Sequence, residues 1–454
     1  MWFVLLSLAT AHASELQLLA HDPAGVTRPA DRCDAALCEA LVALIDGAEH
    51  TLDLAFYGFR DQSAVLAAVD SAVARGVRVR LVVDEDVEGT NYYASTHVWQ
   101  RRFGGVTDHA TDLASAARRP SFRNTSSRCA RPPGFQGPLQ CLAVDLGDGR
   151  CLLTAHVSRD PITFKGDIMH HKFAIADGRA VWTGSANASD SGTGGYNANL
   201  ALVVRSEVVA GWYLAEFEQL AAGRFHKDKG PHEPLQTRLS DGTEVWGYFS
   251  PQDRTLHRHV RPLLREARDS IDIAVFFLTH KSITTELIAA ARRGVRVRIL
   301  LDATAASNGY SKHEILRAAG IAVKVEDWGG KMHAKAAVID GHTLIAGSMN
   351  WTAAGERGND ENTLVVRSQV HAGQLQAWFD RLWNRVPARW LSDRPDAESI
   401  ASGSACFDGV DNDFDGKADA ADPGCTASPP PVPTLPPMEI VPTRDGHCGF
   451  DLLD

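Results

Sequence analysis

One nineteen-residue pattern occurs twice in this chain, and it constrains the fold more than any other feature of the sequence. Residues 169–187 read MHHKFAIADGRAVWTGSAN, and residues 332–350 read MHAKAAVIDGHTLIAGSMN. Both copies contain H-x-K, four residues, D, six residues, and G-S-x-N at identical spacing. The shared residues are His170, Lys172, Asp177, Gly184, Ser185 and Asn187 in the first copy, and His333, Lys335, Asp340, Gly347, Ser348 and Asn350 in the second. The repetition of a whole set of polar residues indicates an internally duplicated protein with a function at the motif.

The duplication extends beyond this motif. Residues 52–84 and 271–302 each contain an apolar stretch, a stretch of helical period, a glycine and a second stretch in which Val and Arg alternate. This order predicts a β-α-β unit in each copy, with the second helix at about residues 283–293. We therefore expect an α/β fold with two repeats, at residues 14–230 and 231–393. The Gly and Pro of residues 226–234 mark the boundary, and the first repeat carries an insertion at about 87–150.

The two ends of the chain differ from the repeats. Residues 1–13 are a short apolar run that ends in Ala-His-Ala, which is typical of a secretory signal peptide. We therefore expect a protein that is secreted or located in the periplasm or cell envelope. Eight cysteines fit an exported protein and allow four disulfide bonds, although their connectivity cannot be deduced. A zinc site formed by Cys129, Cys141 and Cys151 is the weaker alternative.

The tail at residues 394–454 contains an Asp-rich segment followed by a Pro-rich one. Counted from Asp411, the acidic residues have the ligand spacing of an EF-hand calcium loop. These expected ligands are Asp411, Asp413, Asp415, Asp419 and Asp422. Because Cys406 and Cys425 bracket the loop in place of helices, it is similar to the cysteine-bracketed calcium repeats of secreted bacterial proteins. Calcium here is expected to be structural, because the loop lies outside both repeats, and a merely solvated acidic loop is the alternative.

The repeated motif combines groups that suit phosphate chemistry. In a strand, residues i and i+2 point to the same face, so His170 projects beside Lys172, and His333 beside Lys335. The Asp-Gly pair that follows suits a tight hairpin turn. Lysine and asparagine side chains can bind phosphate oxygens. Displacement at a phosphodiester needs a nucleophile and a proton donor, so two histidines from two halves that pack about a pseudo-twofold axis would form one active site.

These motifs match the signature of the phospholipase D superfamily, with two copies in one chain. The resemblance implies two tandem repeats with mixed β-sheets flanked by helices. It also implies a two-step reaction through a phosphohistidine, with no cofactor or catalytic metal, on phosphodiesters that include phospholipids and, in some members, nucleic acids. The catalytic residues that it implies are His170, Lys172, Asp177, His333, Lys335 and Asp340. We expect Asn187 and Asn350 to bind the substrate, and Ser185 and Ser348 to bind it or to orient neighbouring residues. The two aspartates are expected mainly to hold the turns.

Members of this superfamily commonly place a carboxylate after each motif to hold the histidine. The second half has Glu361, whereas the aligned position of the first half is Asn199. A carboxylate partner raises the pKa of an imidazole, and an amide does not. We therefore predict that His170 starts neutral and is the nucleophile, and that His333 starts protonated and is the general acid.

The leading functional hypothesis is a secreted phospholipase D that hydrolyses head groups at a phospholipid membrane surface, with no obligate protein partner. The alternative is a secreted, metal-independent endonuclease of the same superfamily, because a basic run could follow a nucleic-acid strand. This run comprises Arg118, Arg119, Arg123, Arg128 and Arg131. The net charge of −10 argues against a general polyanion binder. A phosphate-binding module without activity and a cardiolipin-type lipid synthase are less favoured.

Overall fold

The computed structural model describes residues 15–118 and 165–426, together with the backbone of short strands between and after them. These strands are β6 (Ser121–Phe122), β7 (Leu142–Asp145), β8 (Arg150–Thr154), β9 (Ile162–Thr163) and β22 (Glu439–Pro442). The proposed signal peptide, the basic run beyond Arg118, the Pro-rich segment and the side chains of Cys129, Cys141, Cys151 and Cys448 lie outside the described residues.

The first repeat is built on a seven-stranded mixed sheet in the order β1-β13-β11-β10-β2-β4-β5. Its strands are β1 (Leu16–Ala20), β2 (Thr51–Phe56), β4 (Arg78–Val83), β5 (Val106–Thr107), β10 (Lys172–Ala176), β11 (Ala180–Gly184) and β13 (Leu200–Arg205). Its helices are α1 (Ala36–Asp46), α2 (Ser63–Ala74), α3 (Thr96–Phe103), α4 (His109–Arg118) and α5 (Glu207–Ala221). The short strands β3 (Phe59–Arg60) and β12 (Ala188–Ser189) pair beside this sheet.

The second repeat has an eight-stranded sheet in the order β14-β15-β21-β20-β19-β16-β17-β18. Its strands are β14 (Leu235–Arg238), β15 (Glu244–Ser250), β16 (Ser270–Val275), β17 (Arg296–Leu301), β18 (Ala322–Val325), β19 (Lys335–Ile339), β20 (Thr343–Gly347) and β21 (Glu361–Arg367). Its helices are α6 (Arg261–Glu266), α7 (Lys281–Arg292), α8 (Ala303–Ser307), α9 (His313–Ala318), α10 (Ala353–Arg357) and α11 (Gln369–Arg385), and the tail adds α12 (Pro423–Thr426). Apart from the extra edge strand β14, the strand order reproduces that of the first sheet.

The predicted β-α-β units are present in both repeats. Strands β2 and β4 are parallel on either side of α2, and β16 and β17 are parallel on either side of α7, which begins two residues before the predicted helix. Gly76 and Gly294 follow these helices with φ of 89° and 92°, a left-handed conformation that favours glycine at a helix end. In both repeats the motif strand then pairs antiparallel with the first strand of the unit, which brings Lys172 opposite Phe56 and Lys335 opposite Val275.

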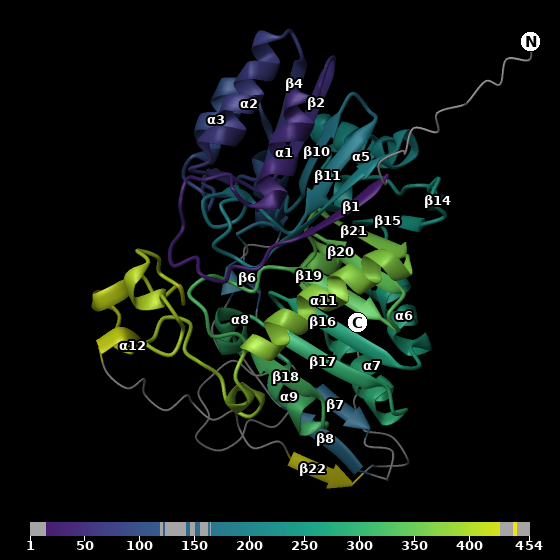
Figure 1. The fold of residues 1–454 in the computed structure, drawn as a ribbon, viewed down its shortest axis with the longest axis vertical. Helices are drawn as coiled ribbons and strands as arrows, with labels where there is room; N and C mark the ends of the chain where they lie inside the picture. Colours follow the sequence, from purple (N-terminus) through teal and green to yellow (C-terminus); the bar gives the residue numbers. More distant parts are fainter. Residues whose placement is uncertain are drawn as a thin grey trace, which may run out of the picture.

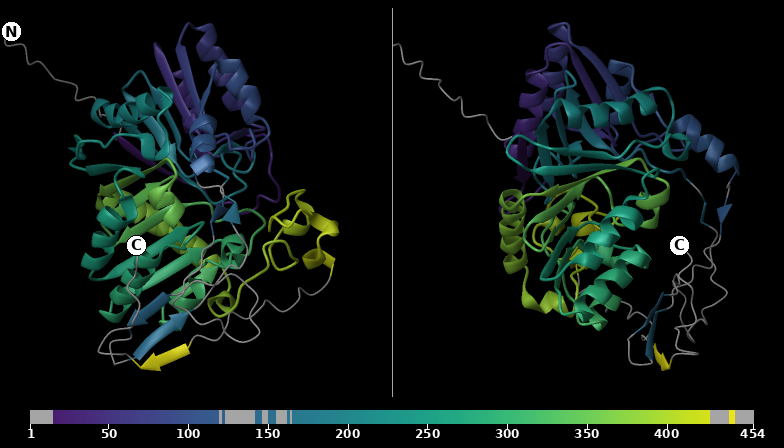
Figure 2. Two further views of the ribbon diagram at one scale, coloured as in Figure 1. Left: turned by 180° about the vertical axis from the view of Figure 1, so that it is seen from behind. Right: turned by 90° about the vertical axis from the view of Figure 1, so that its right-hand side faces the viewer.

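The repeats stack on each other through a shared hydrophobic core (Figure 1). This core contains Phe173 and Leu202 of the first sheet, Leu344 and Leu364 of the second sheet, and side chains of the central helices α5 and α11. Separate cores lie under the outer helices, with α1 and α2 on the first sheet and α6, α7 and α9 on the second. Figure 2 shows the resulting succession of helical and sheet layers from two further sides. The predicted α/β fold of two tandem repeats is therefore confirmed.

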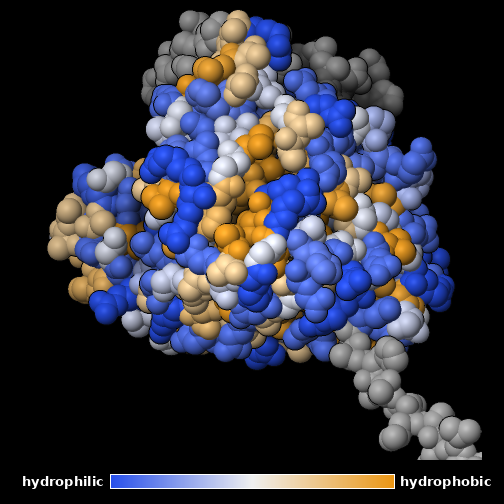
Figure 3. Space-filling model, turned by 90° about the horizontal axis from the view of Figure 1, so that it is seen from above, coloured by the Kyte–Doolittle hydropathy of each residue, from blue (hydrophilic) through white to orange (hydrophobic). Residues whose placement is uncertain are grey.

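The surface is predominantly hydrophilic at the end formed by the first repeat, with hydrophobic groups gathered near its centre (Figure 3). Within the described part of the chain, no helix combines the length and apolar character that crossing a bilayer requires.

Candidate active site

The two copies of the motif meet at the junction between the repeats. The backbone N–H of His170 donates to the carbonyl oxygen of Asp360 in the second repeat, and the N–H of His333 donates to the carbonyl oxygen of Ala198 in the first, each over 2.9 Å. The flanking residues form matching parallel bridges across the junction. These reciprocal contacts are what a pseudo-twofold axis produces, and they bring both histidines to one site, as predicted.

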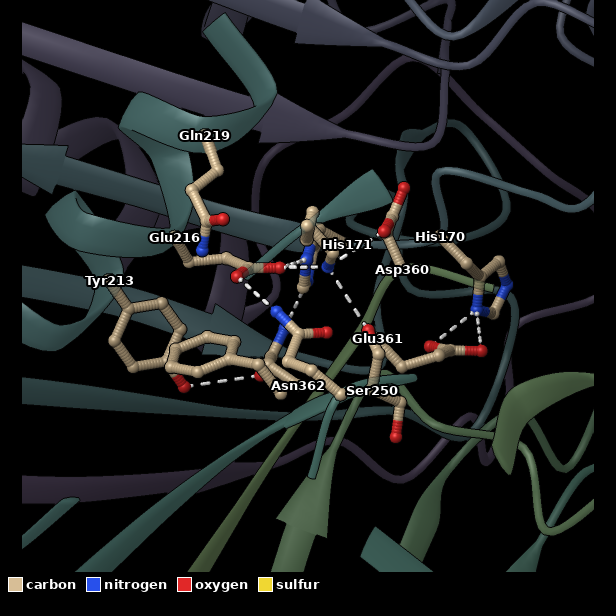
Figure 4. A network of polar contacts seen from close by, with 12 residues as sticks. His170, His171, Tyr213, Glu216, Gln219, Ser250, Asp360, Glu361 and Asn362 are labelled. Carbon is tan, nitrogen blue, oxygen red and sulfur yellow. Dashed lines mark hydrogen bonds and ion pairs between the residues drawn. The ribbon is translucent and has the colours of Figure 1, made fainter. Parts of the chain in front are cut away.

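The partners of the two histidines are crossed between the repeats, which corrects the sequence-based expectation. Glu361 contacts Nδ1 of His170, with both carboxylate oxygens at 2.9 Å (Figure 4), and Nδ1 of His333 lies 3.1 Å from the amide oxygen of Asn199. We expected Glu361 to hold the histidine of its own repeat. The stacking instead places the first residue of β21 beside His170 and the residue before β13 beside His333. The carboxylate of Glu361 therefore contacts His170, and the amide of Asn199 contacts His333.

The electrostatic setting also corrects the expected protonation of His333. Burial, followed by the ammonium groups of Lys335 and Lys172, lowers the pKa of His333 well below its ordinary value. Burial and the same two lysines also lower the pKa of His170. Both imidazoles are therefore neutral in the free protein at pH 7. Burial raises the pKa of Glu361 to about 7, although Lys172 acts in the opposite direction.

The two lysines are buried directly behind the histidines. Lys172 is 0% exposed and Lys335 is 1% exposed, and each Nζ donates to the carbonyl oxygen of the motif histidine over 2.6 Å. Burial lowers the pKa of Lys172 to about 7 and that of Lys335 well below its ordinary value. Each Nζ also lies over an aromatic ring: that of Lys172 is 5.2 Å from the ring centroid of Tyr57, and that of Lys335 is 5.1 Å from the ring centroid of Phe276. An anion placed between these ammonium groups would relieve their mutual repulsion and restore their protonation.

Sequence analysis did not identify this aromatic pair. The ring of Tyr57 also lies 5.3 Å from that of His170, and the ring of Phe276 lies 5.1 Å from that of His333. Both residues follow the first strand of a β-α-β unit, so the alignment of the two repeats, LDLAFYGF with IDIAVFFL, could have paired them.

The serines of the motif orient the partners of the histidines. Ser185 Oγ donates to the amide oxygen of Asn199 over 2.8 Å, and Ser348 Oγ donates to Glu361 over 2.6 Å. Both serines are fully buried. Their position explains why the motif needs a hydroxyl there, and it places neither hydroxyl in a serine nucleophile arrangement with the histidines.

The motif asparagines keep part of their amide groups available. Asn187 Nδ2 donates to the hydroxyl of Tyr93 over 3.2 Å. The amide oxygens of Asn187 and Asn350 are buried without a hydrogen-bond partner among the described residues. Because the orientation of an amide is assigned from its hydrogen bonds, these side chains can present either a donor or an acceptor to a ligand.

The two motif aspartates do not reach the site. Asp177 and Asp340 lie at the opposite ends of strands β10 and β19, five residues beyond the lysines, or about 17 Å along a strand. Asp177 accepts the backbone N–H groups of Glu49, His50 and Thr51 over 2.7–2.9 Å, and Asp340 makes the equivalent contacts to residues 268–270. Both have positive φ, like the glycines after them, as a type I′ hairpin turn requires. They hold turns and do not contact the reacting groups.

A second buried network supports the site from behind (Figure 4). His171 Nε2 lies 3.0 Å from Glu216 of α5, and its Nδ1 lies 3.2 Å from the amide of Asn362 in the second repeat. Lys229 pairs with Glu216 and, at 2.7 Å, with Asp360. This network fixes the segment that carries His170 relative to the strand that carries Glu361.

The Asp-rich loop brings several carboxylates together, in keeping with the spacing of the sequence. Oxygen atoms of Asp411, Asp413 and Asp415 lie within 4.8 Å of one another, as do those of Glu398, Asp413 and Asp422. Asp419 instead accepts the backbone N–H groups of Asp408 and Gly409. Burial raises the pKa of Asp413 to about 6, although the backbone N–H of Asp415, which donates to this carboxylate, acts in the opposite direction. An all-oxygen donor set of this kind fits calcium, with Glu398 in place of Asp419.

The Asp-rich loop lies outside the two repeats in the sequence, but it packs against both of them. Its Phe414 ring packs edge-on against Tyr92 of the first repeat, with centroids 6.0 Å apart, and lies 4.9 Å from Lys331 Nζ of the second. The carbonyl oxygen of Asn412 accepts from Lys331 and Thr304. A disulfide between Cys406 and Cys425 closes the loop, and a second one joins Cys33 and Cys38. The loop therefore contacts both repeats beside the residues that carry His333.

Comparison with known proteins agrees with this geometry. A family model described as "Cardiolipin synthase, PLD-like domain" matches residues 144–221 and 260–383, and each matched stretch contains one copy of the motif. Each half of the chain therefore contains a stretch that is similar to a phospholipase D-like domain. A phosphatidylserine synthase from Haemophilus influenzae Rd KW20 shares the fold of the phospholipase D-like pair. Its structure aligns with a TM-score of 0.51 and 12% identity over 77% of this chain and 84% of that one.

Curated relatives share part of this sequence. The mitochondrial cardiolipin hydrolase of Xenopus tropicalis is 36% identical over 121 residues, which are 27% of this chain and 58% of the relative. A phospholipase D of Rickettsia conorii is 38% identical over 117 residues, which are 26% of this chain and 58% of the relative. The chain therefore spans somewhat more than half the length of each of these relatives.

Proposed function

We propose that this protein is a phosphodiesterase of the phospholipase D type, which hydrolyses phospholipid head groups to leave phosphatidic acid. The observation that supports this most strongly is the meeting of two imidazoles and two ammonium groups, contributed equally by the two repeats. The names of the relatives, a cardiolipin hydrolase and a phospholipase D, support a lipid phosphodiester as the substrate.

The first step is attack by His170. Its Nδ1–H donates to Glu361, so the lone pair of Nε2 is free to attack phosphorus. As the N–P bond forms, the bond from phosphorus to the head-group oxygen breaks and positive charge develops on the ring. The carboxylate of Glu361 stabilises this charge, in the way that the aspartate of a Ser-His-Asp triad stabilises its imidazolium. The crossed pairing thus supports His170 as the nucleophile for a different reason from the one inferred from the sequence.

His333 acts as the proton donor and then as the base. A phosphodiester anion bound between Lys172 and Lys335 offsets the two positive charges that lower the pKa of His333, and so favours its protonation. Because its partner Asn199 is a neutral amide, the imidazolium is a stronger acid than one paired with a carboxylate, and it transfers its proton readily to the departing alkoxide. Neutral His333 next removes a proton from water, which attacks phosphorus, breaks the N–P bond and regenerates His170.

The lysines and asparagines stabilise the charge on the non-bridging oxygens. Lys172 and Lys335 supply positive charge in a buried, low-dielectric setting, where such stabilisation is strong. The Asn187 and Asn350 amides are the additional donors.

We also propose that the protein is exported and that the Asp-rich loop binds calcium. The apolar residues 1–13 and the cysteine content support export. Carboxylates of Asp411, Asp413, Asp415, Asp422 and Glu398 would hold the ion. Bound calcium would neutralise the clustered charges and fix the position of Phe414 beside the site.

The test is a comparison of two substrates. Wild-type protein and its His170→Ala variant are assayed for choline release from phosphatidylcholine vesicles and for cleavage of single-stranded DNA. Choline release that the variant lacks is expected. DNA cleavage without release of any head group from vesicles of phosphatidylcholine, phosphatidylglycerol or cardiolipin would overturn the lipid assignment in favour of the nuclease.

A further inference from the structure

A compact cluster of metal-ligating groups lies behind the candidate active site and has no role in the reaction described above. His226 belongs to the segment that joins the two repeats, yet it is only 3% exposed. Its Nε2 lies 3.4 Å from Asp108 Oδ2 and 3.3 Å from Asp112 Oδ1. One ligand atom from each of these three residues lies within 4.8 Å of the others.

The contacts in this cluster are poor hydrogen bonds. Charge-assisted N–H···O contacts are usually about 2.7–2.9 Å long, so separations of 3.3 and 3.4 Å are too long for a tight pair. Both ring nitrogens of His226 and Oδ2 of Asp112 are buried without a hydrogen-bond partner among the described residues. An imidazole whose nitrogens face carboxylates without being well bonded to them leaves space between Nε2 and the oxygens of Asp108 and Asp112.

The same separations fit a shared metal ion. Zinc binds imidazole nitrogen and carboxylate oxygen at about 2.0–2.2 Å, so two ligands of a tetrahedral ion lie about 3.4 Å apart. The other ring nitrogen, Nδ1, lies 3.0 Å from Asp360 Oδ2 in a geometry that falls short of a hydrogen bond. A carboxylate beside the far nitrogen stands where a metal-bound histidine usually has its support. A cavity of about 170 Å³ adjoins the ring, and its lining includes Asp167, His226 and the cationic side chains of Arg118 and Lys227.

We propose that His226, Asp108 and Asp112 bind one divalent transition-metal ion, of which zinc fits the donor set and spacing best. A nitrogen donor excludes calcium as the preferred ion, because calcium takes oxygen ligands. The site does not depend on the proposed phosphodiesterase activity.

The metal would position the nucleophile and would not contact the substrate. Asp108 Oδ2 accepts the backbone N–H of Met169 over 3.0 Å, and the carbonyl oxygen of Asp360 accepts the N–H of His170. Asp108, a proposed ligand, and Asp360, the residue that would support the metal-bound histidine, thus contact the backbone segments that carry His170 and Glu361. The ion would fix the linker between the repeats against both of them.

The direct test is metal binding by the full chain, in a buffer that contains calcium to occupy the Asp-rich loop. Protein freed of metal by a strong chelator is given zinc or cobalt, passed through a desalting column and analysed for metal content. We expect one zinc per chain and, with cobalt, the intense visible absorption of a tetrahedral ion. Loss of a residue that only supports a metal ligand typically lowers metal affinity about 10–100-fold. Because Asp112→Asn and His226→Gln each remove a ligand, they should lower zinc affinity by more than this.

Two control variants keep the test specific. His109→Gln alters the histidine next to Asp108, whose ring contacts the carbonyl oxygen of Asp86, and it should leave zinc binding unchanged. Asp413→Asn should also retain the zinc, since the Asp-rich loop is a separate site. Folded wild-type protein that retains no zinc and shows no visible cobalt absorption would overturn the proposal, as would equal binding by Asp112→Asn. Because the readout is metal content, failure of the phosphodiesterase assignment would not affect it.

Discussion

The crossed contact between Glu361 and His170 makes the replacement of Glu361 by Gln the most informative single substitution. The carboxylate lies 2.9 Å from Nδ1 of His170. Two full charges at this distance interact by about 6 kcal/mol at an effective dielectric constant of about 20. With about half of the ring charge developed in the transition state, the loss is about 3 kcal/mol, and an amide oxygen that still accepts the N–H returns about 1 kcal/mol.

We therefore expect Glu361→Gln to lower kcat/KM about 30-fold, equivalent to about 2 kcal/mol. The assay is hydrolysis of bis(p-nitrophenyl) phosphate, a soluble phosphodiester whose leaving group is a weak base. Since this leaving group needs little help from an acid, the assay reports the nucleophile. Glu218→Gln in α5, where the carboxylate is 54% exposed, is the matched control and should behave as wild type. An unchanged rate in Glu361→Gln, or a comparable loss in Glu218→Gln, would refute the reasoning.

Three further predictions concern pH, the turns and the tail. The kcat/KM for this substrate should be bell-shaped with its maximum near pH 7: it rises as Glu361 ionises, with a pKa of about 7, and falls as Lys172 loses its proton, with a pKa also of about 7. Glu361→Gln should remove the acidic limb only, and retention of that limb would assign it to another group. Asp177→Ala should lower the free energy of unfolding in urea by about 2 kcal/mol, because it removes three hydrogen bonds from backbone N–H groups, and should leave kcat/KM unchanged; a large loss of activity in folded protein would show a role in the reaction. Calcium at about 100 times its dissociation constant should raise the free energy of unfolding by about 2.7 kcal/mol, an effect that Asp413→Asn should abolish and that calorimetry can measure.

The internal duplication made much of the fold predictable. The β-α-β units and the strand that begins at the lysine of each H-x-K motif depend on local apolar periodicity and on turn residues such as Gly76 and Gly294, which are visible in the sequence. The meeting of His170 and His333 followed from the need for two imidazoles at one phosphodiester.

The partners of the histidines could not be predicted in the same way. Within the sequence, Glu361 follows the motif of His333, and only the stacking of two whole repeats reveals that it faces His170. His226 was visible only as part of a boundary between repeats, because nothing local indicates that a linker residue will be buried against Asp108 and Asp112. Contacts that depend on how two folded units pack are the part that local patterns do not encode.

The central claim is that His170 forms the covalent bond to phosphorus while His333 transfers the proton. The measurement that tests it most directly is rapid quenching of the His333→Ala variant during turnover of a phosphodiester, followed by mass spectrometry of peptides under alkaline conditions that preserve phosphohistidine. We predict that the phosphoryl-containing adduct accumulates in this variant, maps to His170, and is absent from His170→Ala. An adduct on His333 in wild-type protein, or turnover that persists in His170→Ala, would contradict this account.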